Sequence, residues 1–332
     1  MKKKKILITG GAGYVGTVLT QRLLDKGYSV IVYDTLYFGC KLKPHPALEI
    51  IEGDIRDTEK FSKAVKGAHS VINLACISND PSFHLDESLS KSINYDCFEP
   101  LVIAAKKAGV KRFINASSSS VYGVSDHPKV TEEHPLVPLT LYNKYKGLCE
   151  PLLFKHQSKD FVCVNIRPAT ICGYSPRMRL DLSVNILTNH AINYGKITVF
   201  GGEQLRPNLH IEDMVDLYEF LLEAPDEKIA GETFNFGHQN YKISEIAQMV
   251  KKIVQEEFPE KGNIEIVTSP TNDIRSYHIC SEKIEKKLGF RPKRTIEDAV
   301  KDLCKAFKKD LLPNIDDEEY YNVKTLKKKG IS

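Results

Sequence analysis

The 332-residue sequence has no tryptophan, and its eight cysteines form no C-x-x-C pair. Isolated, irregularly spaced cysteines exclude a small disulfide scaffold and are typical of reduced thiols in the cytoplasm. The ten histidines form no H-E-x-x-H pattern and no cluster with cysteine. We therefore expect no metal site.

Long apolar runs and a charge excess are also missing. A membrane span needs about 20 apolar residues, and no stretch approaches that length. The apolar run after the basic residues 2–5 stops at Gly10, which is too short for the core of a signal peptide. Lys and Arg number 47 against 43 Asp and Glu, so the net charge is only +4. We expect a cytoplasmic protein with neither nucleic acid nor a membrane as partner.

Residues 1–168 alternate short apolar runs with helical patterns. Strands are predicted at 5–9, 29–33, 48–52, 70–75, 112–116 and 161–166, and helices at 14–26, 58–65, 85–108 and 141–156. Continuous Val, Ile and Leu strands separated by helices indicate a parallel sheet that is covered on both faces.

After Pro168 the pattern is less regular. Helices are predicted near 181–193, 214–222, 243–255, 281–288 and 296–307, with short strands near Ile197, Phe234 and Ile264. This predicts a second, smaller α+β lobe. No Pro-, Gly- or Ser-rich linker separates the lobes, so we expect a shared interface that holds the ligand site. The charged tail after Lys308 is expected to be partly mobile.

A glycine-rich turn joins the first predicted strand to the first helix. Gly10, Gly11, Gly13 and Gly16 match both G-x-G-x-x-G and G-x-x-G-x-x-G. Such a turn lets the backbone approach a pyrophosphate, whose charge lies at the helix N-terminus. Asp34 ends the second strand, where its carboxylate can bind the adenosine ribose and repel a 2′-phosphate, which favours NAD over NADP.

Tyr142 and Lys146 stand four residues apart on a predicted helix, so both side chains lie on one face. A phenol has a pKa near 10 and is a poor base at neutral pH unless nearby positive charge favours the phenolate. The run 117–120 consists of four serines after the fifth predicted strand and supplies hydroxyl groups at a strand end.

Together, Gly10-Gly11-Ala12-Gly13-Tyr14-Val15-Gly16, Asp34, Asp54-Ile55, Leu74-Ala75, Ser118 before Val121-Tyr122-Gly123, and Tyr142-x-x-x-Lys146 resemble the extended short-chain dehydrogenases/reductases. Within these, the chain is similar to the NAD-dependent nucleotide-sugar epimerase/dehydratase group. The resemblance implies an α/β fold with a Rossmann-type doubly wound parallel sheet and a smaller C-terminal α+β substrate lobe. It implies an NAD-binding domain of residues 1–168, with 208–237 returning to it, and a nucleotide-sugar lobe of 169–207 and 238–332.

The resemblance also assigns roles. Tyr142 matches the catalytic base, Lys146 its partner that binds the nicotinamide ribose, and Ser118 the hydroxyl that holds the reacting oxygen, with Ser117 as its nearest competitor. The implied cofactor-binding residues are Gly10, Gly13, Tyr14, Val15, Gly16, Asp34, Asp54, Ile55, Leu74, Ala75, Cys76, Ser78, Asn94, Tyr142 and Lys146. The implied substrate-binding residues are Ser118, Thr170, Arg177, Arg179, Arg206 and Arg275.

Departures from the family pattern reduce the number of candidate reactions. The 4,6-dehydratases carry an Asp-Glu pair after the catalytic hydroxyl residue, whereas Ser119 and Ser120 stand here. Ordinary hydroxyls cannot perform that acid and base chemistry. Thr170 replaces a substrate-contacting Asn. Residues 175–185 resemble a subgroup of bacterial polysaccharide enzymes that includes one oxidising C4 of a GDP-heptose; in this loop Arg177 and Arg179 either bind phosphate or brace the following helix.

The sequence therefore predicts NAD-dependent oxidoreduction at C4 of a UDP-, GDP- or dTDP-linked sugar, in a 4-epimerase or a 4-dehydrogenase that use the same residues. The alternatives are a 4,6-dehydratase, a keto-sugar reductase, and a catalytically silent NAD-binding regulatory protein. The resemblance also implies a homodimer formed through the helices at 85–108 and 141–156.

Overall fold

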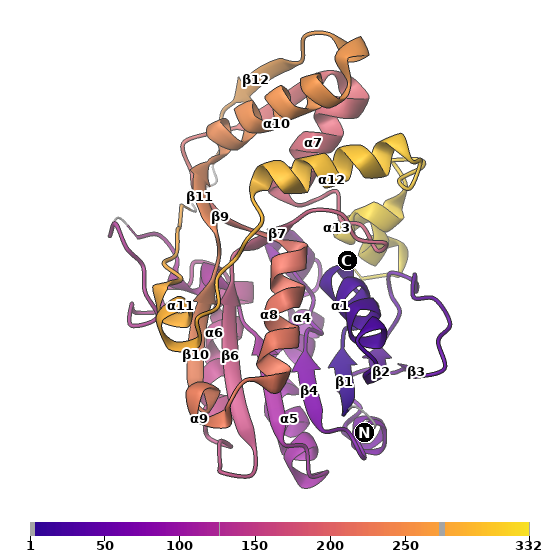
Figure 1. The fold of residues 1–332 in the computed structure, drawn as a ribbon, viewed down its shortest axis with the longest axis vertical. Coiled ribbons are helices and arrows are strands. Elements are labelled where there is room, and N and C mark those ends of the chain that lie inside the picture. The colour runs from indigo at the N-terminus through magenta and orange to yellow at the C-terminus, as the bar shows by residue number, and fades with distance from the viewer. Residues whose placement is uncertain (1–3, 126, 272–275, 332) are drawn as a thin grey trace.

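The computed structural model describes residues 4–125, 127–271 and 276–331, and its larger part is a parallel sheet (Figure 1). Seven strands pair in the order β3-β2-β1-β4-β5-β6-β10, with every neighbouring pair parallel. Their bounds are β1 (Lys5–Thr9), β2 (Ser29–Asp34), β3 (Leu48–Glu52), β4 (Ser70–Asn73), β5 (Arg112–Ala116), β6 (Val162–Pro168) and β10 (Glu232–Phe236). The predicted Rossmann-type sheet is confirmed.

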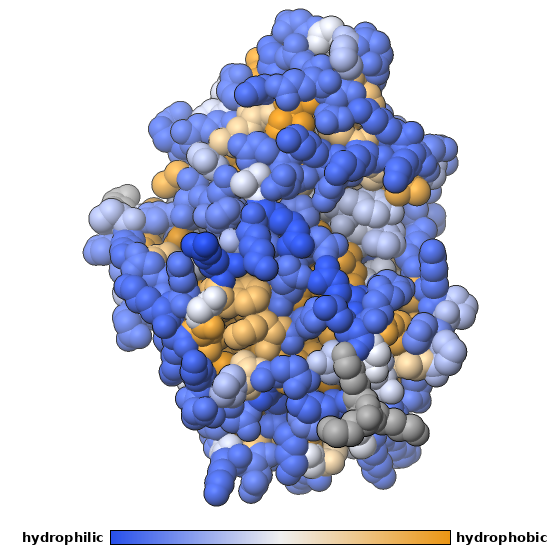
Figure 2. Space-filling view, viewed as in Figure 1, coloured by the Kyte–Doolittle hydropathy of each residue, from blue (hydrophilic) through white to orange (hydrophobic). Residues whose placement is uncertain are grey.

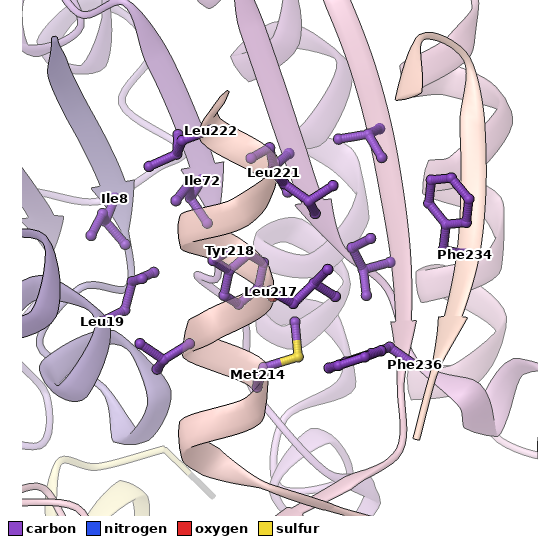
Figure 3. Packing of buried hydrophobic residues seen from close by; sticks show 14 of the residues in the cluster. Ile8, Leu19, Ile72, Met214, Leu217, Tyr218, Leu221, Leu222, Phe234 and Phe236 are labelled. Atoms are coloured by element: carbon purple, nitrogen blue, oxygen red, sulfur yellow. The ribbon is translucent and has the colours of Figure 1, made fainter. Parts of the chain in front are cut away.

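Helices cover both faces of this sheet, as the continuous apolar strands predicted. Alternate residues of β1 face opposite layers: Ile6 and Ile8 pack in one core cluster and Leu7 in another. The first layer holds α1 (Tyr14–Asp25) and α8 (Ile211–Glu223), and the second holds α2 (Thr58–Ala64), α5 (Phe98–Lys107) and α6 (Leu141–Phe154). Figure 3 shows the apolar face of α8, including Met214 and Leu217, lying over the sheet.

The second lobe lies beyond one end of the sheet, in the upper part of Figure 1. Its strands form a three-stranded sheet of β7 (Thr170–Cys172), β9 (Leu205–His210) and β11 (Gln239–Lys242), and a pair of β8 (Lys196–Phe200) and β12 (Glu265–Ser269). Its main helices are α7 (Ser183–Tyr194), α10 (Ile243–Glu257) and α12 (Ile296–Lys308), which share one core cluster. The chain returns to the large sheet through α8 and β10; the domain boundaries themselves stay a prediction.

The helix predicted at 85–108 is interrupted. It forms α4 (Glu87–Lys91), a π-helical turn (Ser92–Asp96) and α5. The turn places the amide of Asn94 against the backbone of Ile77, with 2.8 Å from Ile77 N to Oδ1 and 2.9 Å from Nδ2 to Ile77 O. Such turns occur often at functional sites, and Ile77 belongs to the loop after β4 that lines the cavity described below.

The C-terminal segment, which we expected to be partly mobile, is folded, so that expectation was wrong. It contains α13 (Asn322–Lys328), and Tyr320 and Leu326 are buried. Leu326 and Ile331 belong to the core cluster that also contains Leu7 of the large sheet. The many lysines of this segment lie around a few buried apolar anchors, which the net charge of the segment does not reveal. The remaining short α-helices of the described residues are α3 (Asp80–Phe83), α9 (Asp226–Ile229) and α11 (Glu282–Leu288).

A row of polar side chains crosses the centre of the large sheet. Thr9 Oγ1 donates to Asn73 Oδ1 at 2.6 Å, Asn73 Nδ2 to Asn115 Oδ1 at 3.0 Å, and Asn115 Nδ2 to Asn165 Oδ1 at 2.9 Å. These four residues are register partners on β1, β4, β5 and β6. Because all four are buried, each hydrogen bond satisfies groups that would otherwise destabilise the core.

The surface shown in Figure 2 is largely hydrophilic, with an apolar area between α8 and α11. Phe220 on α8 and Phe290, two residues after the end of α11, have ring centres 4.9 Å apart. Among the described residues, no helix has both the length and the apolar character needed to cross a bilayer.

Candidate active site

A cavity of about 510 Å³ lies at the carboxyl ends of the strands and is lined by both parts of the chain. The carboxyl edge of such a sheet is where doubly wound folds bind ligands. The structure brings nineteen of the predicted site residues together here: Gly10, Gly13, Tyr14, Val15, Gly16, Asp34, Asp54, Ile55, Leu74, Ala75, Cys76, Ser78, Ser118, Tyr142, Lys146, Thr170, Arg177, Arg179 and Arg206.

The glycine turn has no room for side chains. Gly10 has φ of +70°, and a Cβ on Gly16 would lie 2.3 Å from the carbonyl oxygen of Gly10. The helix α1 that follows begins at Tyr14, and its N-cap residue Gly13 offers no side-chain cap. Its first N–H groups are therefore left to bind an anion, as expected for the diphosphate of a dinucleotide.

Asp34 lies at the end of β2, beside this turn. Its carboxylate accepts hydrogen bonds from the N–H of Ala12 at 3.0 Å and of Leu36 at 2.9 Å. Burial raises the pKa of Asp34 above its usual value, while these N–H groups and the charge of Arg177 oppose the rise. The carboxylate is thus held in place beside the glycine turn, as ribose binding requires.

Tyr142 and Lys146 lie on the first two turns of α6, which begins with Thr140 as its N-cap. Lys146 is buried, and its Nζ donates to the carbonyl of Ala116 at 2.7 Å. Burial raises the pKa of Tyr142 well above 10, Cys76 and Asp80 add to the rise, and Arg179 opposes it. The phenol is therefore neutral without a ligand, and a catalytic phenolate needs further positive charge in the cavity.

The four serines at 117–120, after β5, form a serine row whose members make different hydrogen bonds. Ser117 donates to Glu150 Oε1 at 2.6 Å, and Glu150 lies eight residues after the predicted base Tyr142 on α6. Ser118 and Ser120 share a hydrogen bond of 2.7 Å, and Ser120 also donates to the side chain of Asn143 on α6. This arrangement favours Ser118 over Ser117 as the hydroxyl that binds a substrate. Ser120 holds the Ser118 hydroxyl in position through their shared hydrogen bond.

The predicted substrate residues approach from the second lobe. Thr170 lies on β7 and Arg206 on β9, where its guanidinium is 5.4 Å from the ring centre of Tyr277. Arg177 and Arg179 lie on the segment between β7 and α7. Arg275 lies outside the described residues.

One predicted cofactor residue takes another position. Asn94 is buried behind the loop after β4, where its amide binds the backbone of Ile77, and it is not among the residues that line the large cavity. It supports the wall of the cavity. Sequence reasoning also missed Phe38 and Asn322, which line the cavity. No motif marked either of them, and Asn322 lies within the charged tail after Lys308 that we expected to be partly mobile.

The described residues contain no group of three His, Cys, Asp or Glu side chains placed to hold a metal ion. The uncapped start of α1, the space left by Gly10 and Gly16, and the fixed carboxylate of Asp34 fit a dinucleotide instead. This cradle defines the class of the protein as a Rossmann-fold protein that binds a dinucleotide, and Tyr142 and Lys146 line the same cavity.

The chain belongs to the NAD-dependent epimerase/dehydratase family, whose model matches residues 6–237. The glycan biosynthesis protein Agl12 of Haloferax volcanii is 28% identical over 308 residues, covering 89% of this chain and 96% of that protein. A UDP-glucose 4-epimerase of Lactobacillus helveticus is 27% identical over 320 residues, covering 89% and 94%.

Among solved structures, WbmG of Bordetella bronchiseptica in complex with NAD has a TM-score of 0.77 at 24% identity, covering 94% of this chain and 96% of that one. The predicted family, the Rossmann fold, an enzymatic function and NAD as cofactor are confirmed. The roles of the individual site residues stay predictions.

Proposed function

We propose that this enzyme oxidises C4 of a nucleoside-diphosphate sugar and acts as a 4-epimerase or as a 4-dehydrogenase. The observation that carries the proposal is the placement of Ser118, Tyr142 and Lys146 in one cavity with the dinucleotide cradle. Ser119 and Ser120 stand where a dehydratase would need an acid and a base, which favours these reactions over 4,6-dehydration.

Each of the three residues has a distinct task in this proposal. Tyr142 removes the proton from the C4 hydroxyl, Ser118 holds the same oxygen by a hydrogen bond, and Lys146 binds the nicotinamide ribose and favours the phenolate by its charge. NAD, when bound, accepts the hydride from C4. The sugar then carries a ketone at C4.

The substrate binds from the second lobe. Arg206 lines the cavity beside Tyr277, and a planar guanidinium suits a diphosphate. Relatives named UDP-glucose 4-epimerase and glycan biosynthesis protein support a sugar nucleotide and a role in surface-polysaccharide synthesis. The nucleotide is UDP, GDP or dTDP, and the loop at 175–185 makes a GDP-heptose one of the sugars to test.

The epimerase and the dehydrogenase differ in what leaves the cavity. If the 4-keto sugar rotates and the hydride returns to its other face, the product is the 4-epimer. If the keto sugar leaves, the NADH that remains must be reoxidised by another substrate. Residues at the reacting carbon are the same in both reactions.

The experiment is an incubation of the purified protein with a panel of UDP-, GDP- and dTDP-sugars, including heptoses and substrates carrying deuterium at C4. A 4-epimer that retains the deuterium supports the epimerase, and a 4-keto product with deuterated NADH supports the dehydrogenase. A 6-deoxy-4-keto product would instead show dehydration, and the absence of any product with bound NAD would favour a silent regulatory protein.

Two further features belong to the proposal. All eight cysteines are free thiols, which supports a cytoplasmic location. By the family resemblance we also propose a homodimer that packs through the segments 85–108, which contains α4 and α5, and 141–156, which contains α6. The mass of the protein in solution tests this.

A further inference from the structure

Two buried arginines line the cavity on the segment that joins β7 to α7. This segment is fixed to the start of α1: the Tyr14 hydroxyl donates to the carbonyl of Gly173 at 2.6 Å, and the Ser175 hydroxyl donates to the carbonyl of Tyr14 at 2.7 Å. Arg177 and Arg179 follow directly. The segment that bears them therefore lies against the helix start at which a dinucleotide diphosphate binds.

The contacts of the two arginines place them along the dinucleotide site. Arg177 stacks on Phe38, 4.0 Å from the ring centre, and its charge acts on the carboxylate of Asp34. Arg179 donates to Ser78 Oγ at 3.1 Å, and its charge acts on the phenol of Tyr142. One arginine thus neighbours the adenosine-ribose end of the cavity and the other neighbours the reacting end. The diphosphate of NAD joins these two ends.

Each guanidinium group has one nitrogen atom without a hydrogen-bond acceptor among the described residues. The Nε of Arg177 and the Nη2 of Arg179 are buried, and no acceptor for either is present among the described residues. Buried polar groups are nearly always hydrogen-bonded in proteins. Burial, and then the like charge of Arg179, lower the pKa of Arg177 to about 9, while Asp181 and Asp34 oppose this change. An anion with several oxygens would satisfy the free N–H groups and offset the two neighbouring charges.

We propose that Arg177 and Arg179 bind the diphosphate of the dinucleotide and do not bind the diphosphate of the sugar substrate. Arg206 has separate surroundings on β9 beside Tyr277 and serves the sugar nucleotide. The inference rests on the proposed function in one respect only: the contrast between the diphosphate of NAD and that of the substrate assumes that the substrate is a sugar nucleotide.

The C-terminal segment completes this second half of the cofactor site. Asn322 accepts from Arg177 Nη2 at 2.7 Å and donates to Ser78 Oγ at 3.0 Å. Its backbone N–H donates to Asp181 Oδ2 at 3.1 Å, and Asp181 also pairs with Arg179 at 2.9 Å. Asn322 is therefore a positioning residue that links both arginines to the loop after β4.

The test measures the dissociation constants of NADH and ADP-ribose for the full-length protein, without a sugar nucleotide, in the wild type and in Arg177→Met and Arg179→Met. Losing a charge-assisted hydrogen bond to phosphate should raise each constant about 10- to 100-fold. The dissociation constants of UDP and GDP should stay unchanged in these variants. Arg206→Met should raise the dissociation constants of UDP and GDP and leave those of NADH and ADP-ribose unchanged. Asn322→Leu should raise the NADH constant by a smaller factor.

A matched control is Arg291→Met, since the Arg291 side chain is 74% exposed; it should leave the affinity for NADH unchanged. The proposal is overturned if Arg177→Met and Arg179→Met bind NADH like the wild type, or if they weaken UDP or GDP instead. If Arg177→Met does not fold, the test uses Arg179→Met together with the charge-conserving Arg177→Lys. The dissociation constant of NADH for Arg177→Lys should lie between those of the wild type and of Arg179→Met. These titrations contain no sugar, so a failed C4 assignment would leave their result intact.

Discussion

Arg167 on β6 donates hydrogen bonds to both carboxylate oxygens of Glu150 on α6, at 3.0 Å to Oε1 and 2.6 Å to Oε2. Both side chains are buried. The same arginine donates to the Tyr122 hydroxyl at 2.6 Å, and the same carboxylate accepts from Ser117. This pair therefore joins the helix of the predicted base to a central strand and to the turn after β5.

Removing one partner of this pair should destabilise the protein strongly. Arg167→Met leaves the buried carboxylate of Glu150 without its counter-ion, and we expect a loss of about 3–5 kcal/mol in the free energy of unfolding. Urea denaturation measures this loss. The double variant Glu150→Leu/Arg167→Met should lose less than the sum of the two single variants. A single-variant loss below about 1 kcal/mol, the range of exposed pairs, would contradict the assignment.

The serine row offers a test of roles with closely matched substitutions. Ser118→Ala should lower kcat because the reacting oxygen loses its hydrogen bond, and Ser120→Ala should lower it less, because Ser120 only orients Ser118. Ser117→Ala should leave kcat near the wild-type value and reduce the free energy of unfolding by about 1–3 kcal/mol, since Glu150 loses a buried donor. Steady-state kinetics and urea denaturation of the three variants check this order, and a larger kcat effect for Ser117→Ala would reassign the hydroxyl role.

Tyr142→Phe should lower kcat by about 10²- to 10⁴-fold, the usual contribution of a general base, while the affinity for NADH stays near the wild-type value. Because burial raises the pKa of Tyr142 in the free protein, kcat/KM should increase with pH through the neutral and alkaline range. Turnover assays across pH, with NADH titration in parallel, measure both effects. Unchanged turnover in Tyr142→Phe would rule out this residue as the base.

Asp34 should determine the choice of dinucleotide. The wild type should bind NADH more tightly than NADPH, because the carboxylate binds the ribose hydroxyls and repels a 2′-phosphate. Asp34→Asn removes the charge at nearly constant shape and should reduce this preference about 10- to 100-fold. Fluorescence titration with both cofactors measures the ratio. Tighter binding of NADPH by the wild type would revive the keto-sugar reductase.

Five buried thiols should make the protein sensitive to alkaline pH. Burial raises the pKa of Cys97, Cys149, Cys163, Cys172 and Cys304 to about 12. In the unfolded chain a thiol has a pKa of about 8.5. Between that pH and about 12 a thiol ionises in the unfolded chain and stays neutral in the folded protein, which favours unfolding. The free energy of unfolding is therefore unaffected by these thiols below about pH 8.5 and decreases as pH rises towards about 12.

Urea denaturation with a reductant, at about pH 7.5 and about pH 10, should show this loss, since the unfolded thiols ionise across that interval. Cys163→Ala should make the loss smaller, whereas Cys40→Ala, at an exposed position, should leave it unchanged. Equal stability of the wild type at both pH values would contradict the prediction.

The sequence predicted most of the large sheet because its signals are local. The apolar strands, the glycine turn and the Tyr142 and Lys146 spacing each lie within a few residues of one another. The π-helical turn at Asn94 was missed because the contact that accompanies it joins Asn94 to the backbone of Ile77, 17 positions earlier and outside the helical pattern. The short strands β7, β9 and β11 were missed because their few residues carry no clear alternation and depend on pairing with each other.

The residues of the cavity also separate into those marked by local motifs, which could be predicted, and those brought in by distant contacts, which could not. Positions in family motifs could be assigned, and nearly all of them line one cavity. The link between Asn322 and Ser78 could not be foreseen, because it joins residues 244 positions apart through a polar contact that no motif marks. The division of the arginines between two diphosphates likewise depends on Phe38 and Asp34 as neighbours, which only the folded chain provides.

The polar row of Thr9, Asn73, Asn115 and Asn165 has a consequence for the geometry of catalysis. Sliding β4 or β5 along both of its neighbours would break two of these hydrogen bonds, and sliding β1 or β6 would break one, so the row favours one alignment of the four strands. The glycine turn follows Thr9, and the serine row follows Asn115 by two residues. The separation between the anchored end of the cofactor and the hydroxyl that holds the sugar is thus set by side-chain amides beneath the cavity, before either ligand arrives.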